Sequence, residues 1–134
     1  YRFRKADVGL FLRVAERVRA ALVNILTNAQ QAVRVKAPGR ATLPPVVVTT
    51  TAEPEGRWRI TIADRGTGIA PDDLSRIFDP FFTTRSSGSG LGLAIAKNLV
   101  EGLAGTLRVE SQLGAGTTVS IELPERGLPT ENIA

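Results

Sequence analysis

Two asparagines one helical turn apart are the first residues of the sequence whose type and spacing suggest chemistry. Asn24, Asn28 and Gln31 recur at i, i+4 and i+7, so they project from one face of the helix that we expect there. Amides are mediocre helix formers, whereas an amide oxygen is a neutral, hard ligand for Mg²⁺. A solvated helix face rich in amides is the alternative, and these residues alone favour it.

An acidic turn with two glycines, Asp64-Arg65-Gly66-Thr67-Gly68-Ile69, directly follows an expected strand. A carboxylate at a strand end can accept a hydrogen bond from an exocyclic amine, such as that of adenine. Glycines let the backbone approach a flat ligand closely. A plain Asp-led turn explains the same residues equally well, since Asp and Gly dominate turns.

Three of the five phenylalanines fall within the segment Phe78-Asp79-Pro80-Phe81-Phe82-Thr83-Thr84-Arg85. We expect Phe82 and its aromatic neighbours to form a small hydrophobic plug that anchors a loop. A plug does not explain Arg85, which we expect at the loop edge, where a guanidinium can pair with a phosphate.

A glycine-rich segment, Gly88-Ser89-Gly90-Leu91-Gly92-Leu93, opens the next expected helix. The free N–H groups and the dipole of a helix N-terminus attract phosphate. The segment lacks the Lys-Ser/Thr pair of a P-loop, and no strand leads directly into it. A flexible hinge is therefore the alternative. Farther on, Gly114-Ala115-Gly116-Thr117-Thr118 is by itself only a hairpin turn.

The overall composition excludes several kinds of chemistry. Without Cys and His the chain lacks thiolate metal sites and the commonest general base, so any metal should be a hard ion held by oxygens. A hydrophobic content of 43% in 134 residues favours one folded domain. We expect no membrane span and no signal segment. The net charge is +4, and the basic residues are scattered apart from Arg2, Arg4 and Lys5, which favours a phosphate-rich small molecule over nucleic acid.

The elements that position these residues follow from the hydrophobic pattern. We expect helices over 13–36, 71–78 and 91–101, and strands over 46–51, 57–63, 106–111 and 117–123. Residues 1–12 are expected to be a strand or a linker remnant, 13–124 the domain and 125–134 a frayed tail. Strand pairs joined by short turns favour a mixed, mostly antiparallel sheet covered on one face by helices, which is an α+β two-layer sandwich.

The order of the five motifs resembles the N, G1, F, G2 and G3 boxes of the catalytic and ATP-binding domain of sensor histidine kinases. The wider group, the GHKL superfamily, also holds gyrase B, the heat-shock-90 chaperones and the MutL repair proteins. The resemblance covers about residues 16 to 124 and implies the Bergerat fold with a mobile ATP lid. The segment Asn-Ala-Gln-Gln-Ala also resembles the nitrogen-regulation subfamily of these kinases.

The resemblance implies a role for each matching position. Asn28 would hold Mg²⁺ between the ATP phosphates with Asn24 assisting, and these two would be the catalytic residues. Asp64 would bind the adenine amine, and Thr117 would lie near the base. The other implied nucleotide contacts are Gln31, Gly66, Gly68, Ile69, Phe82, Arg85, Gly88, Gly90, Leu91, Gly92 and Leu93.

Three positions depart from related sequences. The branches that hydrolyse ATP carry a Glu as general base where this chain has Asn24, and an amide cannot take a proton from water. We therefore expect transfer to an external nucleophile, not efficient hydrolysis. Many members carry a basic residue and then Tyr where this chain has Gln31 and Ala32.

The implied function is that of a histidine protein kinase that binds ATP and Mg²⁺. Because this chain has no His, the phosphoacceptor would lie on a separate helical dimerisation domain, with a response regulator downstream. The domain would be cytoplasmic and monomeric in isolation, in a parent kinase that is a dimer. Three alternatives remain open: an anti-sigma-type Ser/Thr kinase of the same fold, an ATP-driven conformational module, and a nucleotide-binding module without catalysis.

Overall fold

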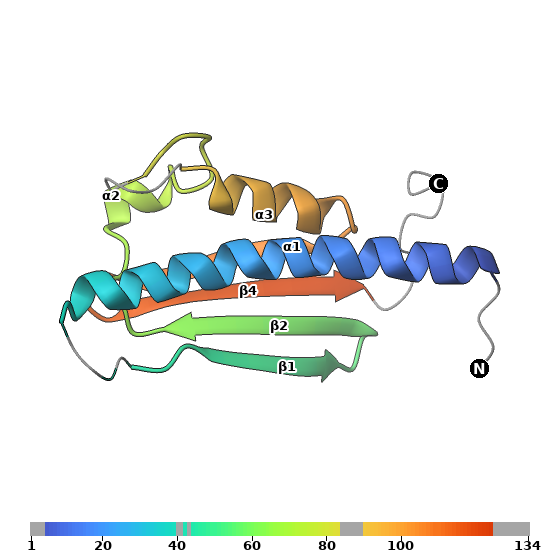
Figure 1. Cartoon of the computed structure of the whole chain (residues 1–134), viewed down its shortest axis with the longest axis horizontal. Coiled ribbons are helices and arrows are strands. Elements are labelled where there is room, and N and C mark those ends of the chain that lie inside the picture. Colours follow the sequence, from blue (N-terminus) through green and yellow to red (C-terminus); the bar gives the residue numbers. More distant parts are fainter. Residues whose placement is uncertain (1–4, 40–41, 43, 84–89, 125–134) are drawn as a thin grey trace.

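The computed structural model describes residues 5–39, 42, 44–83 and 90–124 (Figure 1). The elements in chain order are α1 (Lys5–Lys36), β1 (Val47–Glu53), β2 (Arg57–Asp64), α2 (Pro71–Leu74), α3 (Gly92–Glu101), β3 (Thr106–Gln112) and β4 (Gly116–Pro124). The four strands form one sheet in the order β1-β2-β4-β3, and every neighbouring pair is antiparallel. Helices α1 and α3 pack against each other and cover one face of this sheet (Figure 1). The α+β two-layer sandwich is confirmed.

The core lies between the two helices and the sheet. The largest fully buried side chains are those of Ile25 on α1, Ile62 on β2, Leu103 after α3 and Ile121 on β4. Ile60 and Ile62 on β2 follow the arginines at 57 and 59 in alternation and pack in the core, whereas Trp58, near the start of the strand, is 47% exposed. The pattern that predicted a half-buried strand therefore also fixed which side of β2 meets the core.

Helix α1 begins at Lys5, eight residues before the expected start, so residues 5–12 are helical and not a strand. This stretch contains Lys, Ala and Leu, which are good helix formers, and no Pro. Gly9 and the apolar run after it obscure the helical period, which explains why the pattern pointed elsewhere. Helix α2 is also shorter than expected and gives way to turns after Leu74. The expected tail lies outside the described residues.

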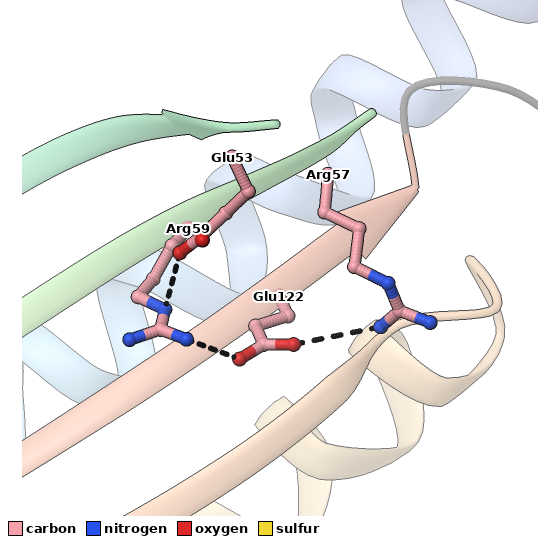
Figure 2. Close-up of polar contacts among 4 residues, drawn as sticks. All are labelled: Glu53, Arg57, Arg59 and Glu122. Carbon is pink, nitrogen blue, oxygen red and sulfur yellow. Dashed lines mark hydrogen bonds and ion pairs between the residues drawn. The ribbon is translucent and has the colours of Figure 1, made fainter. Parts of the chain in front are cut away.

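The face of the sheet that points away from the helices carries a small network of charges (Figure 2). Arg59 lies between two carboxylates, with its Nε 3.1 Å from Glu53 and its Nη2 2.8 Å from Glu122. Arg57 approaches the other oxygen of Glu122 at 3.4 Å. These side chains are between 20% and 49% exposed, so each pair contributes only about 0.2–1 kcal/mol. The network helps to hold β1, β2 and β4 in register.

Nothing among the described helices has the length and apolar character that a bilayer-spanning segment requires. Even α1, with 32 residues, is amphipathic and carries charges along its length.

Candidate functional site

A hollow of about 870 Å³, part of it open to solvent, lies beside the C-terminal half of α1. The end of β2, helix α2 and the start of α3 meet at this end of the molecule, on the left in Figure 1. This volume includes the open mouth of the hollow, which is therefore a cleft and not an enclosed cavity. Its lining is mostly apolar, with a few polar side chains from separate elements. This arrangement is typical of a ligand-binding cleft.

Asp64 stands at the end of β2 with its side chain in the hollow. One carboxylate oxygen accepts a hydrogen bond from the backbone N–H of Gly66 at 2.8 Å. The second oxygen has no partner among the described residues and is available to a ligand. The turn interpretation of this motif is therefore confirmed, and it leaves room for the ligand interpretation because the two use different oxygens.

The loop after Asp64 is packed backbone to backbone against its surroundings. A Cβ on Gly66 would lie 2.6 Å from the Cβ of Ala32 on α1, so no larger residue fits there. Gly68 has a φ of +68°, and a side chain at this position would collide with the backbone of Gln112 at the end of β3. Both glycines are thus required by close approach, which brings the loop against helix and hairpin.

The hairpin between β3 and β4 closes the same end of the hollow. Thr117 is paired directly with Asp64 in the register of β2 and β4, and both side chains line the hollow. Gly114 N–H donates to the carbonyl of Thr67 at 2.7 Å, which joins the hairpin turn to the acidic loop. Lys36, in the last turn of α1, reaches the carbonyl of Gly114 at 2.8 Å. The turn therefore belongs to the site as well as to the hairpin.

The asparagines of α1 face the N-terminus of α3. A Cβ on Gly92, the first residue of α3, would lie 3.5 Å from Asn24 Oδ1 and 3.5 Å from Asn28 Nδ2. Asn24 donates through Nδ2 to the carbonyl of Ala20 at 2.9 Å, which directs its oxygen away from its own helix. Asn28 and Gly92 both line the hollow. Two amides and the positive end of a helix dipole thus converge, which suits an anion and an oxygen-seeking cation.

The phenylalanine segment is only partly the expected plug. Phe78 packs against the core, with Lys97 Nζ 4.6 Å from its ring centre. Phe82 lines the hollow, and the guanidinium of Arg76 covers its ring at 4.4 Å. Phe81, by contrast, is 75% exposed and has a positive φ of 68°. Its exposure contradicts a plug made by all three rings.

Gly90, one of the residues for which the resemblance implies the hinge of the lid, contacts the phenylalanine segment at Phe81. The N–H of Phe81 donates to the carbonyl of Gly90 at 2.9 Å. Gly90 has a φ of +73°, and any side chain there would collide with the backbone of Phe81. Arg85 and Gly88 lie outside the described residues, so their expected phosphate contacts stay predictions.

The structure brings most of the expected residues together. Those that line the hollow are Asn28, Asp64, Gly68, Ile69, Phe82, Gly90, Gly92, Leu93 and Thr117. Asn24 lies next to Gly92, and Gly66 lies next to Ala32, so both are one residue away from the lining. Leu91 is the N-cap residue of α3. Gln31 is half-buried and is not among the residues that line it.

Sequence reasoning missed the apolar walls and one acid. The walls come from Ile25, Ala29, Ala32, Ile62, Ile77, Val109 and Val119, and the acid is Asp73. The apolar residues belong to the same periodic stripes as the core, so no pattern distinguishes a wall of the hollow from the core beneath it. Ser111 was also missed, although its hydroxyl contacts Ile69 and Thr117.

Comparison with known proteins agrees with this geometry. Residues 13–127 match the family described as histidine kinase-, DNA gyrase B- and HSP90-like ATPase. The chain is 39% identical over 109 residues to the sensor histidine kinase ZraS of Escherichia coli K12, covering 81% of this chain and 22% of that protein. It is 38% identical over 109 residues to the histidine-protein kinase AtoS of the same organism, covering 81% and 17%.

A solved structure shows the same architecture. The crystal structure of full-length ShkA in complex with AMPPNP superposes with a TM-score of 0.67 at 32% identity, over 92% of this chain and 23% of that one. This chain thus spans roughly a fifth of the length of these relatives. Sequence and fold agree, and the chain belongs to the family of histidine kinase-, DNA gyrase B- and HSP90-like ATPases.

Proposed function

We propose that this domain binds Mg-ATP in the hollow and transfers the γ-phosphoryl group to a histidine on a separate helical domain, as in two-component signalling. The observation that carries the proposal is the placement of two polar ends in one cleft. Asp64 and Thr117 lie together at the sheet end, while Asn28, on α1, lies beside the start of α3. A nucleotide has the matching polarity, with an amine-bearing base at one end and phosphates at the other.

At the base end, the Asp64 oxygen that has no hydrogen-bond partner in the described part of the chain would accept the hydrogen bond of the adenine amine. The apolar walls, among them Ile62 and Val119, would contact the faces of the ring. Gly68 would lie beside the base, because it lines the hollow next to Asp64. The base would thus be held by one directional contact and by burial, which is the usual composition of a small-molecule site.

At the phosphate end, the residues present fit a magnesium ion bridging two phosphates. The Oδ1 atom of Asn24 and the amide of Asn28 meet beside Gly92, and amide oxygens are hard ligands of the kind Mg²⁺ accepts. Among the described residues no group of three or more Asp, Glu, His or Cys could hold a metal alone. The ion would therefore be held mainly by Asn28 and the nucleotide's own phosphates, which is the common way Mg²⁺ binds in phosphoryl-transfer sites.

The reaction that this site favours is transfer, not hydrolysis. Asn24 stands where a general base for water would be needed, and an amide cannot accept that proton. Phosphoryl transfer depends mostly on positioning and on neutralising charge, which Mg²⁺, the start of α3 and the asparagines would supply. A nucleophilic imidazole needs little help from a base. Because no residue of this chain is a histidine, the acceptor must be supplied from outside these 134 residues.

The partners follow from the same proposal. The acceptor would be a helical dimerisation domain, and the phosphoryl group would pass on to a response regulator. The parent kinase would be a dimer through that helical domain, whereas this domain alone would be monomeric. Its place would be the cytoplasm, where ATP is available. No nucleic-acid partner is proposed.

Calorimetric titration with a non-hydrolysable ATP analogue, with and without Mg²⁺, tests the binding half of the proposal. Asn28→Ala should lose much of the stimulation by Mg²⁺, because the amide oxygen is the proposed metal ligand. Asn98→Ala, an exposed asparagine on α3, is the matched control and should behave as the unmodified chain. If Asn28→Ala leaves both the affinity and its dependence on Mg²⁺ unchanged, the role of Asn28 is wrong.

Incubation with labelled ATP and a cognate helical domain tests the transfer half. The helical domain should acquire an acid-labile phosphoramidate, and this chain should stay unlabelled. An acid-stable label on a partner protein would point to the Ser/Thr kinase alternative, and rapid release of phosphate by the isolated chain would point to a conformational ATPase.

A further inference from the structure

Ser111, near the end of β3, makes three hydrogen bonds through one hydroxyl group without lining the hollow. It accepts the backbone N–H of Ile69 at 2.8 Å and donates to the carbonyl of Gly116 at 3.0 Å. Its oxygen also lies 2.8 Å from the hydroxyl oxygen of Thr117, and either hydroxyl could be the donor on distance alone. One partner, Ile69, belongs to the acidic loop, and the other two, Gly116 and Thr117, are the first residues of β4.

Counting protons decides the direction of the bond to Thr117. A serine hydroxyl has one proton and two acceptor lone pairs. The carbonyl of Gly116 can only accept, so the single Ser111 proton is used there. The N–H of Ile69 can only donate, so it occupies one lone pair. The remaining lone pair of Ser111 is left for Thr117, which must therefore be the donor.

The consequence lies inside the hollow. Once the Thr117 proton points at Ser111, the Thr117 oxygen offers only lone pairs to a ligand or to a water between them. Asp64, its direct neighbour across β2 and β4, also offers only an acceptor. Asp64 and Thr117 therefore both present acceptors at the sheet end of the hollow. Such an end favours an amino group and disfavours a carbonyl oxygen, which would meet unpaired acceptors.

We propose that Ser111 is a positioning residue that sets the base preference of the site by fixing the direction of the Thr117 hydroxyl. The inference rests on the proposed binding of a nucleotide, and it names the feature that is selected: a 6-amino purine over a 6-oxo purine. Ser111 acts through Thr117 and does not touch the ligand. Without Ser111 the Thr117 hydroxyl can rotate and donate, so a 6-oxo purine would be tolerated better.

The test compares the affinities of ATP and ITP, whose bases differ in the 6-amino and 6-oxo groups, in the presence of Mg²⁺. Ser111→Ala should weaken ATP binding by about five-fold, the size of one net hydrogen bond, and should lower the ratio of ATP to ITP affinity by a similar factor. Ser120→Ala is the matched control, because Ser120 lies on β4 on the opposite face of the sheet and should leave the ratio unchanged. Ser111→Thr keeps a hydroxyl and should restore the ratio.

Two further variants separate positioning from packing. In a Thr117→Val background, adding Ser111→Ala should no longer change the ratio, since no hydroxyl remains to be directed. Ser111→Cys keeps the shape with only a weak donor and a weak acceptor. It should shift the ratio in the same direction as alanine, and it carries the test if the alanine variant does not fold.

The possible failures are distinguishable. If the unmodified chain binds neither nucleotide, the proposed function is wrong and this inference is wrong with it. A second outcome is that the unmodified chain binds ATP more tightly than ITP while Ser111→Ala and Ser111→Cys leave the ratio of the two affinities unchanged. In that case only the inference about Ser111 is overturned. The inference is also overturned if adding Ser111→Ala to the Thr117→Val variant changes the ratio of ATP to ITP affinity as much as it does in the unmodified chain. Ser111 would then not act through Thr117.

Discussion

Replacing Gly66 by alanine would place a methyl group 2.6 Å from the Cβ of Ala32 and 2.7 Å from its carbonyl carbon. Carbon atoms in contact normally stand about 3.5–4.0 Å apart, so the overlap is close to 1 Å. Ala32 is only 5% exposed and lies in the body of α1, so it cannot retreat. The loop must move instead, and overpacking of this kind costs about 1–3 kcal/mol. We expect Gly66→Ala to lower the free energy of unfolding by about 2 kcal/mol.

Urea denaturation followed by circular dichroism measures this loss. With a typical slope of about 2 kcal/mol per molar urea for a small domain, the midpoint should fall by about 1 M. Nucleotide affinity should fall as well, because the displaced loop carries Gly68 and Ile69, which line the hollow.

Gly114 provides the control, because its requirement for glycine has a different cause. Its φ is +84°, and no described atom lies within 4 Å of the position of a Cβ. Alanine there pays only the cost of a left-handed conformation, about 1–2 kcal/mol, and asparagine tolerates that conformation better. At position 114, asparagine should therefore lower the free energy of unfolding by less than alanine does. At position 66, where space is the limit, asparagine should lower it by more than alanine does. The opposite order at position 66 would refute the reasoning from crowding.

Three shorter predictions follow from the same geometry. Gly92→Ala should fold normally, because the added methyl makes ordinary contacts of 3.5 Å or more, yet it should weaken nucleotide binding at the start of α3 in calorimetry. Asp64→Asn should keep the thermal unfolding temperature, since its amide oxygen can still accept from Gly66 N–H, but should lose about ten-fold or more in ATP affinity because an NH₂ group then faces the base amine. Glu122→Gln should lower the free energy of unfolding, measured by urea denaturation, by less than about 1 kcal/mol, and by less still in high salt. Glu110→Gln, which changes an exposed residue on β3, is the control and should leave this free energy unchanged.

Local patterns were enough to predict the sheet and its covered face. The alternation of Trp58, Ile60 and Ile62 with arginines assigned β2, and Pro54 and Gly56 marked the turn before it. The start of α1 could not be predicted in the same way, because residues 5–12 lack a clear amphipathic period. A helix there depends on propensity and on continuation of the helix that follows, and neither leaves a periodic signal.

The polar members of the site were predictable because each is unusual for its place. An asparagine in mid-helix and an aspartate at a strand end both invite an explanation. Asp73 and Ser111 are ordinary for their surroundings, since an acid in the first turn of a helix and a serine in a strand need none. Their relation to the hollow depends on how α2 and β3 pack against elements distant in sequence, and single-residue patterns carry no information about that.

The structure also changes how the competing interpretations of each motif should be weighed. Asp64 does not have to be either a turn residue or a ligand residue, because one of its carboxylate oxygens makes the turn while the residue also lines the hollow. The same holds for Gly68, which the hairpin requires through its close approach to Gln112 and which also lines the hollow. A loop fixed by its own packing presents its polar groups without further ordering when a ligand arrives, and that lowers the entropic cost of binding. Structural necessity at these positions is therefore an argument for the binding role and not against it.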